Sequence, residues 1–252
     1  MSPTARYVFA VARSLRAEDL ADTVGFHDVP LDVVSHRGLS AVVCDVELAE
    51  FGEEALTKNL EDLAWLEWAA RTHDGVVWRV AGLATCAPLR LVTVCSDDDS
   101  VRAKVDALHG DLEAVLDRVE GRKEWSLKVL APAPVEREPV PAPSGASSGA
   151  DYLRRKREAA GRRRELGEQA LQAAEVLHRV ASEHAVASRR LAPQDPRLTG
   201  RPEPMVLNGA YLVEADQHES FRAAVAAAAE LRDDVSIELE GPWPPYSFAV
   251  LS

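Results

Sequence analysis

The apolar positions in residues 1–73 switch between the two-residue period of strands and the three-to-four-residue period of helices. In chain order they predict a buried strand, a short helix, two hairpin strands and a longer helix, over residues 7–12, 18–24, 31–35, 39–46 and 53–73. His36-Arg37-Gly38, between the two hairpin strands, is the expected turn. The inner side of the longer helix is predicted to be an apolar stripe of Leu56, Leu60, Leu63, Leu66 and Ala70.

The pattern is less regular in the next stretch. Val76–Val80 fits either a continuation of the helix or a short strand. Pro88–Cys95 then predicts a central strand. Ser96–Asp99 supplies an N-cap and the negative charge that favours the start of a helix, which is expected to reach Val119.

Trp125–Leu130 is expected to close this first domain as its last strand. Residues 1–130 are therefore predicted to form an α+β domain with a modified ferredoxin-like β-α-β-β-α-β plan and one inserted helix. Residues 131–149 contain five prolines and a Ser/Gly-rich run. A segment of this composition has no packing stripe, so a protease-sensitive linker is expected here.

No proline interrupts the chain from Asp151 to Leu191, so one long helix is predicted over residues 151–191. An apolar stripe at steps of three and four residues follows its second half, at Leu166, Ala170, Ala173, Leu177, Val180, His184, Ala187 and Leu191. This coiled-coil-like spacing predicts that one narrow face packs against another element. The first half instead has seven cations within residues 154–164. Gly161 and Gly167 each lower helix stability by about 1 kcal/mol relative to alanine.

Residues 150–252 are expected to form a second α+β domain around this helix. The pattern after the helix predicts a strand, an alanine-rich helix and another strand, at residues 205–213, 217–231 and 235–239. The tail from Gly241 to Val250 contains three prolines and three aromatic residues. It is expected to be an extended segment pinned by its rings.

Composition and charge narrow the class of protein. The 252 residues are 46% hydrophobic and 28% charged, which is ordinary for a soluble globular protein of two domains. No apolar run approaches the ~20 residues of a membrane span, and no signal peptide is visible, so we expect a cytoplasmic protein.

The net charge of -12 argues against nonspecific nucleic-acid binding. Residues 151–192 carry ten Lys+Arg against six Asp+Glu, and the rest carries 19 against 35. A basic helix on an acidic body suits an acidic partner or another copy.

No local motif indicates catalysis, a metal or a cofactor. The sequence has no glycine-rich phosphate loop, no HExxH and no GxSxG. His178 and His184 are six residues apart, which does not place both on one helix face as metal ligands. Asp97–Asp99 fits a helix cap better than a cation site. The three cysteines lack ligand spacing and are expected to be buried thiols: Cys44, Cys86 and Cys95. We therefore expect no enzyme, no metal and no cofactor.

The candidate site residues are five arginines in the first half of the long helix: Arg154, Arg155, Arg162, Arg163 and Arg164. Three interpretations are open, namely a solvated helix face, contact with a partner or another copy, and contact with nucleic acid. Nucleic acid is disfavoured because only Tyr152 interleaves an aromatic ring with the cations. Our hypothesis is that these arginines form a partner-binding surface.

Three stretches resemble the gas vesicle accessory proteins F and L: residues 59–66, 149–157 and 239–248. Their order and spacing cover nearly the whole chain. The resemblance implies an N-terminal modified ferredoxin-like domain, a C-terminal α+β domain with a long helix, and a cytoplasmic role in building gas vesicles. One departure is Leu91-Val92, where the family commonly has Phe-Gly, so a role that depends on that glycine is not expected to carry over.

The resemblance also implies partners. Members of the family are linked to the small shell-forming protein A and to a minor place in the vesicle. A water-excluding shell needs a very apolar inner face, which free monomers expose before assembly. We therefore expect an assembly factor that binds shell protein A and other gas vesicle accessory proteins, limits aggregation and assists nucleation. The alternative is a minor structural component that self-associates through the long helix. The resemblance carries over no catalytic residues, and it leaves the F and L paralogues open.

Overall fold

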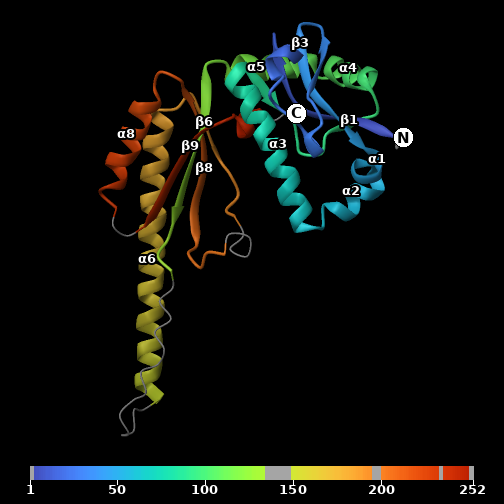
Figure 1. Ribbon diagram of the computed structural model, residues 1–252. Helices are drawn as coiled ribbons and strands as arrows, with labels where there is room; N and C mark the ends of the chain where they lie inside the picture. Colours follow the sequence, from blue (N-terminus) through green and yellow to red (C-terminus); the bar gives the residue numbers. More distant parts are fainter. Residues whose placement is uncertain (1–2, 134–148, 195–199, 233–234, 250–252) are drawn as a thin grey trace. The chain divides into compact units, whose positions relative to one another are not determined.

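The computed structural model describes residues 3–133, 149–194, 200–232 and 235–249. The chain divides into two compact units, which have different bounds from the predicted domains. Residues 1–123 and 243–252 form the first unit, and residues 124–242 form the second. The C-terminal tail therefore belongs to the same unit as the N-terminal strand (Figure 1).

The first unit is built on a five-stranded sheet in the order β2-β3-β1-β4, with β5 also paired to β1. The strands are β1 (Thr4–Arg13), β2 (Asp32–His36), β3 (Leu39–Glu47), β4 (Cys86–Pro88) and β5 (Val94–Cys95). β2 and β3 form the predicted hairpin, in which His36 pairs with Leu39. Arg37 and Gly38 between them have φ angles of 49° and 83°. Positive φ at both central residues is what a two-residue hairpin turn of this twist requires.

Helices cover both faces of this sheet because β1 is apolar at consecutive positions rather than at alternate ones. Tyr7 and Phe9 of β1 pack with Val77 of α3 on one face, whereas Val8 and Val11 pack against α4 and α5 on the other. The α-helices are α1 (Leu48–Phe51), α2 (Glu53–Asn59), α3 (Leu63–Leu83), α4 (Asp98–Ala107) and α5 (His109–Val119). The 3-10 turns are η1 (Ala17–Leu20), η2 (Phe26–Asp28) and η3 (Tyr246–Phe248).

A buried hydrogen-bond chain connects β1 to α3 and to the segment between β4 and β5. The Tyr7 hydroxyl accepts a 3.0 Å hydrogen bond from the Val92 backbone N–H and lies 2.9 Å from His73 Nδ1. Burial raises the pKa of Tyr7, so the hydroxyl stays protonated and donates its hydrogen to Nδ1. Burial lowers the pKa of His73 to about 4. The neutral His73 ring therefore carries its own hydrogen on Nε2.

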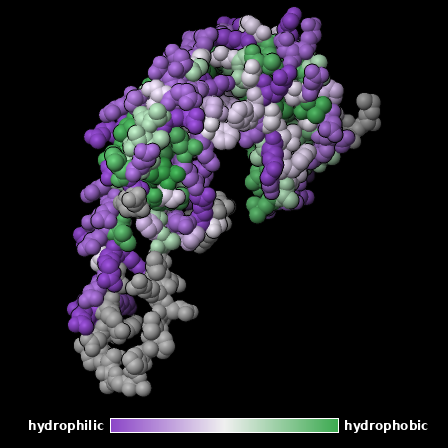
Figure 2. Space-filling model, turned by 60° about the vertical axis from the view of Figure 1, so that its left-hand side comes forward, coloured by the Kyte–Doolittle hydropathy of each residue, from purple (hydrophilic) through white to green (hydrophobic). Residues whose placement is uncertain are grey.

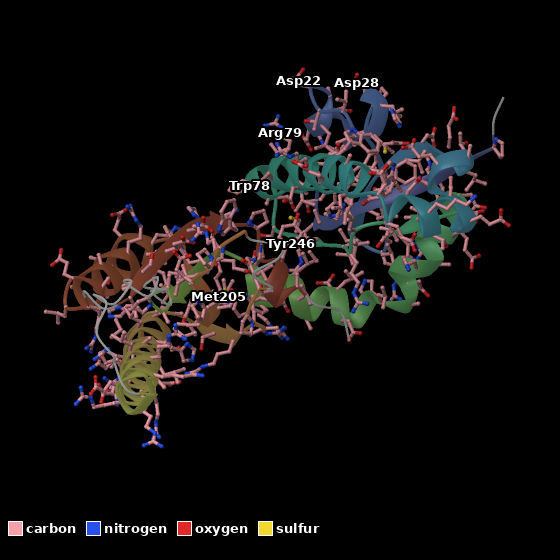
Figure 3. The ribbon with its side chains drawn as sticks, turned by 90° about the horizontal axis from the view of Figure 1, so that it is seen from below. Asp22, Asp28, Trp78, Arg79, Met205 and Tyr246 are labelled. Carbon is pink, nitrogen blue, oxygen red and sulfur yellow. The ribbon has the colours of Figure 1, made fainter. Side chains whose placement is uncertain are left out.

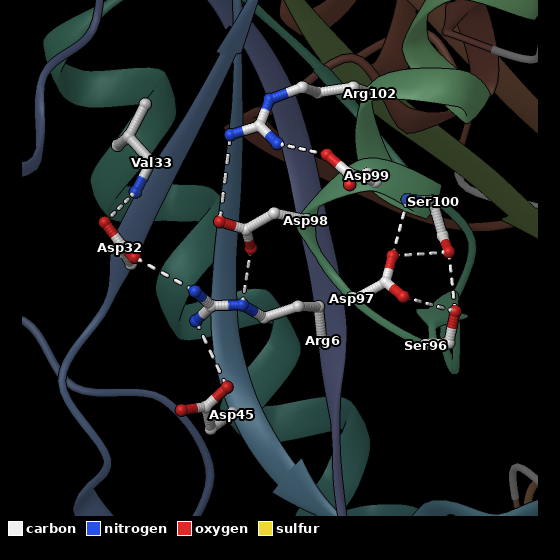
Figure 4. A network of polar contacts seen from close by, with 10 residues as sticks. All are labelled: Arg6, Asp32, Val33, Asp45, Ser96, Asp97, Asp98, Asp99, Ser100 and Arg102. Atoms are coloured by element: carbon white, nitrogen blue, oxygen red, sulfur yellow. Dashed lines mark hydrogen bonds and ion pairs between the residues drawn. The ribbon is translucent and has the colours of Figure 1, made fainter.

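Arg6 on β1 ties β2, β3 and α4 together (Figure 4). Its guanidinium pairs with Asp32 at 3.3 Å, with Asp45 at 3.1 Å and with Asp98 at 2.7 Å. Asp97 caps α4 by accepting a 2.7 Å hydrogen bond from a backbone N–H in the first turn. The predicted capping role of this acidic run is therefore confirmed.

The second unit contains a four-stranded sheet in the order β7-β8-β6-β9. Its elements are β6 (Arg122–Leu130), α6 (Gly149–Glu183), β7 (Ala187–Arg190), β8 (Met205–Glu214), α8 (His218–Ala229) and β9 (Ser236–Trp243). Leu177 of α6 and Phe221 of α8 share a buried core with Tyr211 of β8. The Tyr211 hydroxyl lies 2.8 Å from His178 Nδ1. This contact repeats the tyrosine–histidine pairing of the first unit.

The helix predicted over residues 53–73 is divided at Asp62. The Asp62 side chain accepts a 2.9 Å hydrogen bond from the first turn of α3 and so starts a new helix. α3 then runs through Val76–Val80, which identifies this segment as helix. The restart changes the buried face: Leu60 and Leu63, predicted to lie inside, are 41% and 75% exposed.

The strand predicted at Pro88–Cys95 is interrupted and does not lie at the centre of the sheet. β4 and β5 are separated by a turn, and both pair with β1 alone among the described strands. Val92 in this turn has a φ angle of 60°, which is rare for a β-branched residue. The hydrogen bond from its backbone N–H to Tyr7 holds the turn in place.

Two other helices of the first unit are shorter than predicted. The one expected over residues 18–24 is reduced to η1, because Val24 instead pairs with Pro30 in an isolated β-bridge. The helix expected to reach Val119 is divided into α4 and α5 at Leu108, whose ψ angle of 7° leaves the helical range.

Two predictions at the edges of the second unit are wrong. Trp125–Leu130 do not close the first sheet, because β6 lies between β8 and β9 in the second sheet. The helix predicted over residues 151–191 ends at Glu183, and Ala187–Arg190 pair antiparallel with β8. These residues exchange helical hydrogen bonds for inter-strand ones, and no breaker residue in the sequence marks the change.

The predicted α+β class is confirmed by two antiparallel sheets with packed helices. The ferredoxin-like plan and the coiled-coil-like packing of the long helix stay predictions. Most of the linker predicted at residues 131–149 lies outside the described residues. The compact units of the structure thus differ from the predicted bounds at 1–130 and 150–252, both at Glu124–Leu130 and at the C-terminal tail.

Candidate functional site

The candidate arginines lie on the first half of α6 (Figure 1). We call residues 149–169 of this helix the arm, because Ala170 is the first buried side chain that the structure describes in α6. The side chains described between residues 154 and 169 are exposed. In the space-filling view, the coloured lower part of the arm is hydrophilic, whereas hydrophobic residues gather on the body above it (Figure 2). The arm thus presents its charges to solvent.

The arm is helical because its charged residues are good helix formers and pair along the helix. Arg154 and Glu158 lie 4.0 Å apart, and Arg164 and Glu168 lie 2.8 Å apart, both at four-residue spacing. Each such pair stabilises a helix by about 0.2–0.5 kcal/mol. This support is small, so packing of the second half of α6 contributes most of the helix's stability.

Four cations of the arm form no ion pair within the described residues: Lys156, Arg157, Arg162 and Arg163. The Arg155 side chain lies outside the described residues. The two pairs that do form are exposed and contribute little, so Arg154 and Arg164 remain able to exchange partners. The structure therefore places Arg162, Arg163 and Arg164 together on one exposed turn of helix.

The arm also continues the buried seam of α6. Ala170, Ala173 and Leu177 are buried, and Leu177 belongs to the core of the second unit. The same helix face continues into the arm as Leu166 and Arg163, which lie four and seven residues before Ala170. Leu166, predicted to pack, is 44% exposed. The face thus offers an apolar side chain beside a cation that has no ion pair among the described residues, a combination suited to a partner with both apolar and acidic groups.

The other residues weighed from the sequence have structural contacts. Burial raises the pKa of the Cys44 thiol to about 11 and that of Cys86 to about 12, so both stay protonated. Cys95 is buried as well. Burial lowers the pKa of His178, which contacts Tyr211. In the part of the chain that the structure describes, no cluster of His, Cys, Asp and Glu could hold a metal ion.

A second candidate site is a cavity of about 580 Å³ in the first unit. Its lining comes from α3, the segment between β4 and β5, α4 and the C-terminal tail, and it includes His73. Sequence reasoning missed it because these four segments are far apart in the chain. The single local signal was the irregular stretch at residues 75–90, where no regular period could be assigned.

Together these features define a class: α+β proteins of two units, with a basic helical arm as the most distinctive exposed feature. A family model described as gas vesicle synthesis protein GvpL/GvpF matches residues 5–250. The chain belongs to this family of gas vesicle proteins. None of the described helices is long and apolar enough to span a membrane.

Individual relatives agree with this assignment. Gas vesicle protein L of Streptomyces sp. (strain CB03234) is 38% identical over 247 residues, covering 97% of this chain and 92% of that protein. Gas vesicle protein F of the same strain is 25% identical, covering 96% and 98%. The crystal structure of the gas vesicle protein GvpF from Anabaena sp. PCC7120 superposes with a TM-score of 0.69 at 16% identity, covering 99% and 97%. The GvpF structure from Microcystis aeruginosa gives 0.67 at 19% identity, covering 98% and 99%. These structures share the fold.

Proposed function

We propose that this protein is a non-enzymatic, cytoplasmic gas vesicle assembly factor that binds the small hydrophobic shell protein A. By covering the shell protein before assembly, it limits aggregation and assists nucleation of the vesicle. Membership of the gas vesicle family supports a role related to gas vesicles. The observation that carries the proposal is the exposed arm, where Arg162 and Arg163 have no ion pair among the described residues.

The arm suits this task because it combines charge with apolar surface. Leu166 is exposed within one helical turn of Arg162 and Arg163. A shell monomer has apolar surface to cover, and cations beside an apolar side chain add orientation and salt-dependent attraction to any acidic group near it. The remaining acidic surface of the protein keeps the complex soluble by charge repulsion.

The second candidate function is a minor structural component of the vesicle that self-associates through α6. The division of charge motivates it, because residues 151–192 are net basic and the rest of the chain is strongly acidic. The arm of one copy then contacts the acidic surface of another.

We also infer that the chain is of the L type, because its identity to protein L of one strain exceeds its identity to protein F of the same strain, 38% against 25%.

Capture of purified shell protein A and sedimentation with intact gas vesicles separate the two functions. The assembly-factor proposal predicts that the full-length protein retains shell protein A and reduces its light scattering. It also predicts that the protein stays mainly in the supernatant when vesicles are isolated. Failure to retain shell protein A, together with constant recovery in washed vesicles, contradicts the proposal and supports the structural component.

A further inference from the structure

The two halves of α3 differ in what packs on them. In the second half, Trp243 of the chain's own tail packs edge-to-face on Trp78, with ring centroids 5.5 Å apart. One turn earlier, the Tyr246 hydroxyl donates a 2.5 Å hydrogen bond to Asp74 Oδ1. Figure 3 labels Trp78 on α3 and Tyr246 on the tail. The tail is thus pinned by its rings, as predicted.

The start of α3 has exposed apolar surface instead. Leu63, its first residue, is 75% exposed, and Leu60, which follows α2, is 41% exposed. Hydrophobic side chains are visible at the lower end of the first unit, where α2 meets α3 (Figure 2). Exposed apolar side chains that are grouped rather than scattered indicate a contact surface. We call this surface the corner and define it by five residues: Glu53, Glu54, Leu60, Glu61 and Leu63.

The corner is acidic as well as apolar. Residues 47–67 carry seven Asp+Glu against one Lys. Glu50 and Glu67 pair with basic side chains, and Asp62 caps α3. The three acidic residues of the corner are exposed and form no ion pair within the described residues: Glu53, Glu54 and Glu61. The corner therefore suits a partner that carries cations around an apolar side chain.

The arm has this complementary composition. Leu166 is 44% exposed, and Arg162 and Arg163, within one helical turn of it, form no ion pair in the part of the chain that the structure describes. Residues 151–192 carry ten Lys+Arg against six Asp+Glu. At the rise of an α-helix, residues 149–169 are about 30 Å long, so the arm offers enough length for a neighbouring copy to lie along it.

We propose that the corner of one copy of this chain binds the arm of another copy. Leu166 packs against Leu60 and Leu63, and the cations of the arm pair with the carboxylates of the corner. This inference rests on the second candidate function, self-association through α6, and names its receiving surface. Arm and corner are different surfaces, so the contact is heterologous and joins copies head to tail.

Sedimentation velocity of the full chain at low salt measures the association. The wild type is expected to form larger species as its concentration rises and to dissociate when salt is added. A corner variant is expected to associate about tenfold more weakly or worse, because its corner then repels the arm. It combines three substitutions: Glu53→Lys, Glu54→Lys and Glu61→Lys.

A matched control makes the same change in net charge at exposed carboxylates of the first unit outside the corner. It is expected to associate as the wild type does, because the corner and the arm are both intact. It combines three substitutions: Glu18→Lys, Asp22→Lys and Asp111→Lys.

Combined variants test whether these two surfaces meet. An arm variant with Arg162→Glu, Arg163→Glu and Arg164→Glu is expected to be mainly monomeric, as is the corner variant, because arm and corner then carry the same sign. A mixture of the two variants brings opposite signs together again and is expected to associate. A single chain that carries all six substitutions is expected to recover association as well.

Leu63→Gln tests the apolar part of the contact. It is expected to weaken self-association about three- to tenfold, because Leu63 becomes covered only when the copies join. Its unfolding is expected to match that of the wild type, since the side chain is exposed. Leu231→Gln is the matched control, because Leu231 is 78% exposed in the second unit.

The outcomes separate this proposal from the proposed function. A wild type that stays monomeric at every concentration overturns both the corner contact and self-association through α6. If the corner variant associates as the wild type does while the arm variant does not, the arm binds another surface and the corner proposal alone is overturned. An arm–corner contact within one chain, which does not depend on concentration, also overturns it. Capture of shell protein A by the corner variant is expected to be undiminished, because its arm is intact.

Discussion

Two buried tyrosines hold a helix to a sheet in the same way, one in each unit. Tyr7 lies 2.9 Å from His73 Nδ1, and Tyr211 lies 2.8 Å from His178 Nδ1. The surroundings differ, because His73 is fully buried whereas His178 is half-buried. Tyr7 also accepts a backbone hydrogen bond from Val92. The first pair is therefore expected to contribute more to stability.

Tyr7→Phe is expected to lower the free energy of unfolding by about 1–3 kcal/mol, because it leaves Val92 N–H and His73 Nδ1 without their partner. Tyr211→Phe is the matched control, and it is expected to cost about 1 kcal/mol or less because water reaches the half-buried His178. Urea unfolding of the two variants and the wild type measures both losses. Equal losses of unfolding free energy in the two variants would show that the fully buried pair stabilises the protein no more than the half-buried pair does.

Neither pair is predictable from local sequence. The partners are separated by 66 and 33 residues, so no spacing within an element connects them. The same reason hid the cavity around His73. Of the candidate site residues, the arginines were predictable because seven cations within eleven residues form a local signal. Their exposure is confirmed for Arg154, Arg162, Arg163 and Arg164, whereas their role stays a proposal.

Elements with a strong period and clear turns were predicted well. The hairpin around Arg37 and the strand starting at Met205 both form. Predictions were wrong where one local contact redirects the chain, as at Asp62, which caps a new helix. They were also wrong where strand pairing replaces helix, as at Ala187–Arg190. In such places tertiary hydrogen bonding outweighs propensities worth less than about 1 kcal/mol per residue.

The two halves of α6 are expected to respond differently to truncation. Leu177 is fully buried in the core of the second unit, so Leu177→Ala is expected to cost about 2–5 kcal/mol. Leu166→Ala is the matched control in the arm, where the side chain is 44% exposed, and it is expected to change stability by about 0.5 kcal/mol or less. Thermal or urea unfolding distinguishes them. A loss at Leu166 as large as at Leu177 would mean that the arm is packed in solution.

At the scale of the whole molecule, the distribution of charge matters more than its total. The ten cations and six anions of residues 151–192 contrast with 19 cations and 35 anions elsewhere. Such a division favours oriented, salt-sensitive association with an acidic surface, which in our proposal belongs to shell protein A or to another copy. The arm can contact a partner without disturbing the core of the second unit, because none of its described side chains is buried.

Two variants with the same change in net charge isolate the arm. The arm variant combines the substitutions Arg162→Glu, Arg163→Glu and Arg164→Glu. The control variant combines Arg71→Glu, Arg79→Glu and Arg179→Glu, which replace three exposed helical arginines outside the arm. Both are expected to unfold within about 1 kcal/mol of the wild type, because exposed ion pairs contribute little. A third variant with glutamine at the three arm positions removes the charge and keeps good helix formers.

The affinity of these variants for shell protein A at low salt tests the central claim most directly. The account predicts that the wild type and the control variant bind alike. The arm variant is expected to bind about tenfold more weakly or worse, the glutamine variant to fall between, and raised salt to weaken the wild type in the same direction. If the folded arm variant retains shell protein A as well as the control does, and self-associates no less than the wild type, the arm is only a solvated helix face and the account is contradicted.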